Sequence, residues 1–388
     1  MKIELKKELF GSEKIWEVLP GTAVVLVMML LAMLASRYLG SLFKAAFELD
    51  NSPVSEFLVA MVFGMIVRNL ITFPGLFNVG FKFCVAKLLR LGIILLGIRL
   101  SIVSVAQIGA VALVAVFACV AAGILVTTGI SRLLSVPPRL GTLIAAGTAI
   151  CGISAIVATA PAIGASDEET AYAVSTITIF GLLATMLYPY LAELVLHLNP
   201  AQAGLFLGTA VHDTSQVTGA AYIYDQIWDR GVSEIAITTK LVRNTFMVIV
   251  IPLLSYLYSR KFAKLESAEG DGAHKINVRK IFPMFVLGFL GFSILRSVGD
   301  LLSARETTGG SFWLTPDSWL AFHTAVRRIA AILLLTAVTA TGLSTRFSRL
   351  KELTLKPFLI GFIAAAGVGM VSYAFVRIMK AAIGRLLL

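Results

Sequence analysis

The chain has 388 residues, of which 58% are hydrophobic and 14% are charged, and its formal net charge is +11. An ordinary soluble domain has about 45–50% apolar and about 25% charged residues, so these proportions exclude that class. They predict an all-α polytopic membrane protein. In such a protein, Lys and Arg gather in cytoplasmic loops, so the positive charge does not indicate a nucleic-acid partner.

Eleven segments are long and apolar enough for membrane helices, which need about 20 residues each. In chain order they are residues 21–39, 54–71, 83–101, 106–130, 141–163, 170–195, 201–224, 234–258, 281–302, 318–342 and 356–384. The polar stretches 259–280 and 303–318 are too short to be domains. We therefore expect a single membrane transport domain over residues 1–388.

Basic residues indicate the orientation of the chain. Beyond the charged N-terminal lead, residues 1–20, they gather at 68–90, at Arg132 and Arg139, at 260–280 and at 346–356. With a cytoplasmic N-terminus, all these clusters lie on the cytoplasmic side, as the positive-inside rule requires. No small-residue cleavage pattern follows the lead. We expect a multi-pass inner-membrane protein with a retained first span and with residues 1–20 and the loop 259–280 in the cytoplasm.

The cysteines give no sign of redox or metal chemistry. Cys84, Cys119 and Cys151 all fall in apolar segments, and their odd number argues against a disulfide framework. No Cys–His cluster has the spacing of metal ligands. The sequence therefore predicts neither a metal site nor a cofactor.

An internal repeat is visible in the sequence. GTAICGISAIVATA, at 147–160, aligns without gaps with GTAVHDTSQVTGAA, at 208–221, and each copy precedes a long apolar helix with a proline near its far end, Pro189 or Pro252. A fainter match pairs LRLGIILL, at 89–96, with RRIAAILL, at 327–334. Weak internal symmetry of this kind is typical of transporters.

Counting crossings separates two topologies. If both Gly-Thr-Ala elements cross the membrane, they run parallel, whereas the segments that contain Arg90 and Arg328 run antiparallel. If each Gly-Thr-Ala element is instead a re-entrant hairpin, all paired segments become inverted repeats. The sequence thus favours nine crossings and two opposed hairpins, with eleven spans that include two broken helices as the alternative.

The two elements are candidate halves of a transport site. Gly, Thr, Ser and Asp weaken a helix interior, and broken backbone in hydrocarbon is tolerated only where it is buried in protein or lines a cavity. Half-helices that begin near Ser154 and Ser215 would point N–H groups at an anion. Close helix packing through small residues is the alternative. The predicted substrate-binding residues are Gly147, Thr148, Cys151, Gly152, Ser154, Gly208, Thr209, Thr214, Ser215, Gln216, Lys240 and Arg243.

Charged residues inside the predicted spans sharpen this hypothesis. A carboxylate at membrane depth costs ~2.5–3.5 kcal/mol, so Asp213 should be paired, protonated or in contact with water. Histidine titrates near neutral pH, so His212 and Asp213 are predicted to carry a coupled proton. Capping of a hairpin mouth is the alternative for this pair. Lys240 and Arg243 lie well inside a span, where they either partner Asp213 or the substrate, or extend toward the membrane surface.

Four motifs resemble a known family. LLRLGIILLGIRL, GTAICGISAIVATAP, GTAVHDTSQV and KLVRN are similar to the YeiH-type family of proposed sulfate exporters, bacterial inner-membrane proteins of the bile acid/arsenite/riboflavin transporter superfamily. The resemblance covers about residues 20–385. It implies an inverted-repeat secondary transporter with broken helices in its core. It assigns Cys151, Gly152, Ser154, His212, Asp213 and Gln216 to the site.

The resulting prediction is a secondary transporter that moves a small anion (sulfate, sulfite or a sulfonate) by alternating access, coupled to a proton or to sodium. A passive anion channel also fits two opposed hairpins. A membrane-embedded enzyme is disfavoured because no His-Glu-x-x-His, Asp-rich diphosphate or Gly-x-Ser-x-Gly motif occurs. The expected partners are the anion and the lipid bilayer, and homo-oligomerisation is left open.

Overall fold

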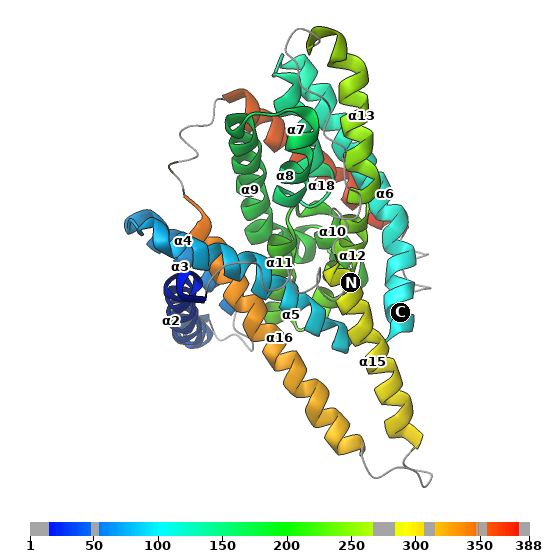
Figure 1. Ribbon diagram of the computed structural model, residues 1–388. Helices are drawn as coiled ribbons and strands as arrows, with labels where there is room; N and C mark the ends of the chain where they lie inside the picture. The colour runs from blue at the N-terminus through cyan, green and yellow to red at the C-terminus, as the bar shows by residue number, and fades with distance from the viewer. Residues whose placement is uncertain are drawn as a thin grey trace. The chain divides into compact units, whose positions relative to one another are not determined.

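The computed structural model describes residues 15–47, 54–266, 284–305, 315–346, 348 and 355–379, and all regular elements in these ranges are helical (Figure 1). This confirms the all-α prediction. The α-helices are α2 (Ile15–Phe47), α3 (Glu56–Leu70), α4 (Gly75–Phe83), α5 (Leu89–Leu96), α6 (Ile102–Leu133), α7 (Pro138–Ala149), α8 (Ile153–Thr159), α9 (Asp167–Tyr190), α10 (Pro200–Ala210), α11 (Thr214–Trp228), α12 (Val232–Thr245), α13 (Met247–Glu266), α15 (Phe285–Arg305), α16 (Pro316–Ser344) and α18 (Leu355–Ile378). The lead before Ile15 and the part of the predicted 259–280 loop after Glu266 lie outside the described residues.

Six helices of the described chain are long and apolar enough to cross a membrane. They contain Trp16–Phe43, Ile102–Leu133, Asp167–Val195, Phe285–Ser303, Pro316–Ser344 and Lys356–Ile378. The pair Val232–Thr245 and Met247–Arg260, bent by 42°, makes a seventh if it is one span. The other expected spans are shorter or broken helices in the structure. The total of nine crossings and two hairpins stays a prediction.

The chain divides into two compact units that alternate along the sequence. Unit 1 contains Met1–Ile108, Ala221–Glu234 and Met284–Arg346, and unit 2 contains Gly109–Ala220, Ile235–Pro283 and Phe347–Leu388. Both Gly-Thr-Ala elements, as well as Lys240 and Arg243, belong to unit 2. The candidate site is therefore built inside one unit.

Unit 1 is organised around α16, which packs along α3 and α5, while α2 packs on α3 and α4 (Figure 1). A Cβ placed on Gly92 would lie only 2.7 Å from Leu334 Cδ2. The two segments of the fainter sequence match, 89–96 and 327–334, thus lie side by side. His323 is 6% exposed and its ring packs against Trp319, so it is part of the core of unit 1.

Unit 2 places α7 and α8 against α9 and α13, as the apolar cluster around Leu143, Ile156 and Ile177 shows. α18 packs on α9 and α10, where Ser372 and Thr209 exchange a hydrogen bond of 2.6 Å between their hydroxyl groups. At the start of α9, Ser166 and Glu169 form a capping box. The acids Asp167, Glu168 and Glu169 therefore lie at a helix N-terminus, where they complement the helix dipole as an ordinary helix start does.

Both predicted broken helices are present, and their breaks fall at matching positions of the repeat. α7 ends at Ala149 and α8 begins at Ile153, while α10 ends at Ala210 and α11 begins at Thr214. Each break is thus three residues long and directly follows a Gly-Thr-Ala triplet. The prediction of half-helices that begin near Ser154 and Ser215 is confirmed.

Candidate functional site

Asp213 caps the N-terminus of α11. Its Oδ1 accepts hydrogen bonds from the Ser215 N–H at 2.9 Å and from the Ser215 hydroxyl at 2.8 Å. The Gln216 side chain accepts from the Asp213 N–H at 3.1 Å, which completes a reciprocal capping box. Gln216 also donates to the Thr178 carbonyl oxygen at 3.2 Å. Helix capping, the alternative role of Asp213, therefore accounts for Oδ1 but not for Oδ2. Both polar atoms of the Gln216 side chain have partners within the protein.

The second oxygen of Asp213 faces the other break. A Cβ placed on Gly152 would lie 3.4 Å from both Oδ2 and Cβ of Asp213. Gly152 is the N-cap residue of α8 and has no side chain with which to cap it. The Asp213 carboxylate thus lies close to the N-termini of α8 and α11, both of which carry partial positive charge. The two halves of the repeat meet at this carboxylate.

The conformation of Gly152 makes this contact possible. Its φ of 67° and ψ of −119° lie in a region that is open almost only to glycine.

We expect Gly152→Ala to lower the thermal midpoint of the purified protein and to displace Ser154, because the backbone must leave this region. Gly164→Ala is the matched control, because Gly164 also has a positive φ, 60°, and open space around it. With its ψ of 34°, this is the left-handed helical conformation, which residues other than glycine adopt at a cost of about 1–2 kcal/mol. An equal loss in both variants would contradict a special role for Gly152.

Lys240, on α12, binds the backbone of both breaks. Its Nζ donates to the carbonyl oxygens of Ile150 and Val211 at 3.0 Å each, and to that of His212. An ammonium group has three protons, so all of its donors are in use. The side chain is fully buried.

Arg243 lies one turn further along α12 and binds the two helix ends themselves. Its guanidinium donates to Ala149 O at 2.9 Å and to Thr148 O at the end of α7, and to Thr209 O at 2.6 Å and Val211 O at 3.4 Å at the end of α10. The last carbonyl groups of a helix have no intrahelical donor and carry partial negative charge. Arg243 supplies both the donors and the charge that these ends need.

Lys240 and Arg243 are therefore a cationic clamp, in which one helix holds both broken elements. Both side chains have zero exposure, so the prediction that they extend toward the membrane surface is wrong. Among the described residues no ion pair within 4.0 Å joins either side chain to Asp213, although Lys240 is near enough for its charge to interact with that carboxylate. Direct binding of substrate by these two side chains stays a prediction. In the structure their N–H groups donate to backbone carbonyl oxygens.

His212 is the most unusual buried residue of the site. It is 1% exposed, and neither ring nitrogen has a hydrogen-bond partner among the described residues. The Thr148 hydroxyl, near the end of α7, is also buried without a partner among the described residues. Buried polar groups in proteins are almost always paired, so unpaired ones point to water or a ligand as the missing partner.

Ser154 is the most accessible of the predicted site residues. It is exposed in the first turn of α8, and neither its hydroxyl nor the N–H groups of Ile153 and Ser154 have acceptors in the described chain. Other predicted residues have partners within the protein. Gly147 packs against Ile156 and Ile177, and Gly208 packs against Thr239 and the Ala236 carbonyl oxygen. Cys151 Sγ lies 3.3 Å from Met247 Sδ. Thr209 bonds to Ser372, and the Thr214 hydroxyl accepts from the Asn244 amide at 3.2 Å.

Sequence comparison places the chain among bacterial membrane proteins. The sequence model of the family described as Conserved hypothetical protein 698 matches residues 20–361. A UPF0324 membrane protein of Nitratidesulfovibrio vulgaris is 30% identical over 357 residues, 90% of each chain. A UPF0324 membrane protein of Streptococcus pneumoniae is 30% identical, and the match covers 86% of this chain and 90% of that protein. One of Fusobacterium nucleatum is 28% identical, and the match covers 86% of this chain and 92% of that protein. No solved structure matches. The resemblance to the YeiH-type family is thereby confirmed, and the chain belongs to the UPF0324 membrane protein family, whose sequence model is described as Conserved hypothetical protein 698.

Proposed function

We propose that the chain is a secondary transporter that moves a small anion, such as sulfate, sulfite or a sulfonate, across the bacterial inner membrane by alternating access. The observation that carries this proposal is the meeting of the two breaks at Gly152 and Asp213, beside the exposed Ser154. Paired broken helices at a repeat interface are the usual setting of a transport site. In this proposal the N-terminus is cytoplasmic and the chain catalyses no reaction.

The charges of the site favour an anion. Two basic side chains, Lys240 and Arg243, and one acidic side chain, Asp213, lie at the breaks, and no other acid of unit 2 is described near them. The backbone N–H groups of Ile153 and Ser154 and the Ser154 hydroxyl are donors without acceptors. A helix N-terminus with free donors favours an anionic group. The anion would bind at the start of α8, next to Gly152.

The same geometry suggests how a proton would be coupled. The ionised Asp213 carboxylate lies close to the N-terminus of α8, so it repels an anion that approaches the same donors. Protonation removes this negative charge, while Oδ1 can still accept from Ser215. Binding of the anion would then require a proton on Asp213. His212, with two unpaired ring nitrogens, is the second candidate for carrying it.

The test is the uptake of radiolabelled sulfate, sulfite and a sulfonate by proteoliposomes that contain the purified protein. We expect saturable uptake and exchange of internal for external anion, which distinguish a carrier from a channel. Ser154→Ala should lower uptake about tenfold or more, and Ser154→Thr should retain most of it, because threonine keeps the hydroxyl group. Ser259→Ala, at a half-buried serine on α13, is the control. Equal uptake in Ser154→Ala and wild type would refute the placement of the anion at α8.

A further inference from the structure

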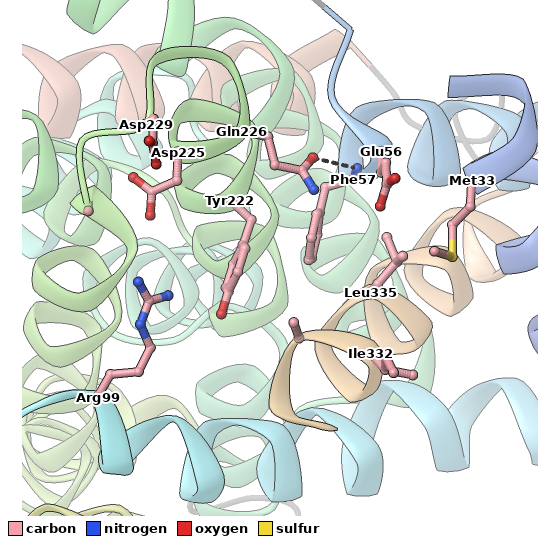
Figure 2. Close-up of a pocket in the computed structure, with 12 residues that line it drawn as sticks. Met33, Glu56, Phe57, Arg99, Tyr222, Asp225, Gln226, Asp229, Ile332 and Leu335 are labelled. Atoms are coloured by element: carbon pink, nitrogen blue, oxygen red, sulfur yellow. Dashed lines mark hydrogen bonds between the residues drawn. The ribbon is translucent and has the colours of Figure 1, made fainter. Parts of the chain in front are cut away.

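A separate pocket of about 580 Å³ lies inside unit 1 (Figure 2). Its residues come from α2, α3, the segment before α6, α11, the turn between α11 and α12, and α16, and none of them belongs to the site at the two breaks. Typical small-molecule pockets have about 300–1,000 Å³, so this one has room for a compact organic molecule. Its lining combines an apolar wall with several charged groups.

The apolar wall is built by aromatic and aliphatic side chains. The rings of Phe57 and Tyr222 stack with centroids 4.6 Å apart and an interplanar angle of 16°. Ile332 and Leu335, from α16, lie beside them in Figure 2. The Gln226 side chain accepts a hydrogen bond from Ser55 at 2.6 Å, which holds the start of α3 against the end of α11. These residues form a wall that a short hydrocarbon chain can contact.

The charged groups of the pocket are mostly paired by the protein. Arg99 forms an ion pair with Glu234 at 2.7 Å, and Arg37 lies 3.8 Å from Glu56. The Asp225 oxygens accept from the N–H groups of Val232 at 2.6 Å and Ser233 at 3.0 Å, which caps the start of α12. Each of these carboxylates therefore has a positive or N–H partner.

Asp229 is different. Its side chain is exposed at the pocket, beside Asp225 in Figure 2, and its carboxylate has no ion pair or hydrogen bond among the described residues. It lies in the short turn between α11 and α12, with a φ of 50°. The pocket thus presents one uncompensated carboxylate next to an apolar, aromatic wall.

We propose that this pocket binds an organic cation that carries one ammonium group on a short hydrocarbon chain. The ammonium would pair with Asp229, with Asp225 as a second acceptor, because each carboxylate oxygen can accept more than one hydrogen bond. The hydrocarbon part would lie against Ile332, which is 51% exposed, and the half-buried Met33, with the buried rings of Phe57 and Tyr222 behind them. Arg99, held by Glu234, would disfavour a second positive group at that end of the pocket. This ligand differs in sign from the proposed transported anion, so the pocket would be a second site.

The experiment is isothermal titration of the purified full-length protein in detergent with butylammonium, butan-1-ol and butyrate, three probes of similar size. We expect butylammonium to bind and the neutral and anionic probes to bind at least tenfold more weakly. Asp229→Asn should weaken butylammonium binding at least tenfold, whereas Asp167→Asn, at an exposed acid of unit 2, should leave it unchanged.

Three results would overturn the proposal: no binding of butylammonium to the wild type, equal binding of butyrate or butan-1-ol, or unchanged binding in Asp229→Asn. Asp229 is exposed on a turn, so its variant should fold, and an unchanged thermal midpoint checks this. Anion uptake by the same variant, measured separately, would show whether the pocket influences transport.

Discussion

Arg243→Met is expected to be the most damaging single substitution in the described chain. It leaves three buried backbone carbonyl groups, those of Thr148, Ala149 and Thr209, without their side-chain donor, whereas the Val211 carbonyl keeps its bond from Lys240. An unpaired buried acceptor costs about 1–3 kcal/mol, so the loss from three of them should be at least about 3 kcal/mol. The measurements are the yield of monodisperse protein and its thermal midpoint in detergent, and we expect Arg243→Met to give little or no folded protein.

Two further variants make this prediction specific. Arg243→Lys keeps the charge but cannot reach both helix ends with a fork of donors, so it should be folded and clearly less stable than wild type. Arg328→Met removes an exposed arginine from α16 and should change the thermal midpoint little. If Arg243→Met were as stable as Arg328→Met, the carbonyl contacts of Arg243 would not stabilise the fold.

Asp213→Asn is expected to remove the pH dependence of anion uptake. Asparagine caps a helix as well as aspartate does, so the bond from Ser215 and the start of α11 should persist. Without the negative charge, the N-terminus of α8 is open to the anion at every pH. Wild-type uptake should therefore rise as the pH falls and Asp213 becomes protonated, whereas the variant should take up anion at a similar rate across the same range.

The design separates the charge of Asp213 from its capping role. Asp213→Ala loses both, and the lost cap should lower the stability by about 0.5–2 kcal/mol. Asp167→Asn tests whether removal of any exposed acid changes the pH profile. A wild-type profile in Asp213→Asn would assign the coupled proton to another group, and His212→Asn would then test the other predicted carrier.

The sequence predicted the broken helices well because helix termination is a local property. The Gly-Thr-Ala triplets, the glycine at position 152 and the capping residues at 213 and 216 act within a few residues of each break. Their matching positions in the repeat also predicted half-helices that begin near Ser154 and Ser215, and these helices begin at Ile153 and Thr214. Six of the eleven predicted apolar segments are helices of membrane length in the described chain, because apolar length is read directly from the sequence.

The clamp could not be predicted in the same way. Lys240 and Arg243 were recognised as unusual, but their partners are backbone carbonyl groups, which every residue has and which leave no pattern in the sequence. The approach of Asp213 to Gly152 depends on how α7, α10 and α12 pack, which is a tertiary property. Asn244, which bonds to Thr214, and Ser372, which bonds to Thr209, were missed although Asn244 directly follows Arg243.

The clamp also restricts how such a protein can work. Seven buried hydrogen bonds tie α12 to both breaks. At about 1.5–3 kcal/mol for each bond to a charged group, separating the two half-helices would cost on the order of 10 kcal/mol. A cycle that opened the site by pulling its halves apart would meet that barrier at every turnover. In the proposed transport cycle, the two broken helices should therefore move together as one rigid body.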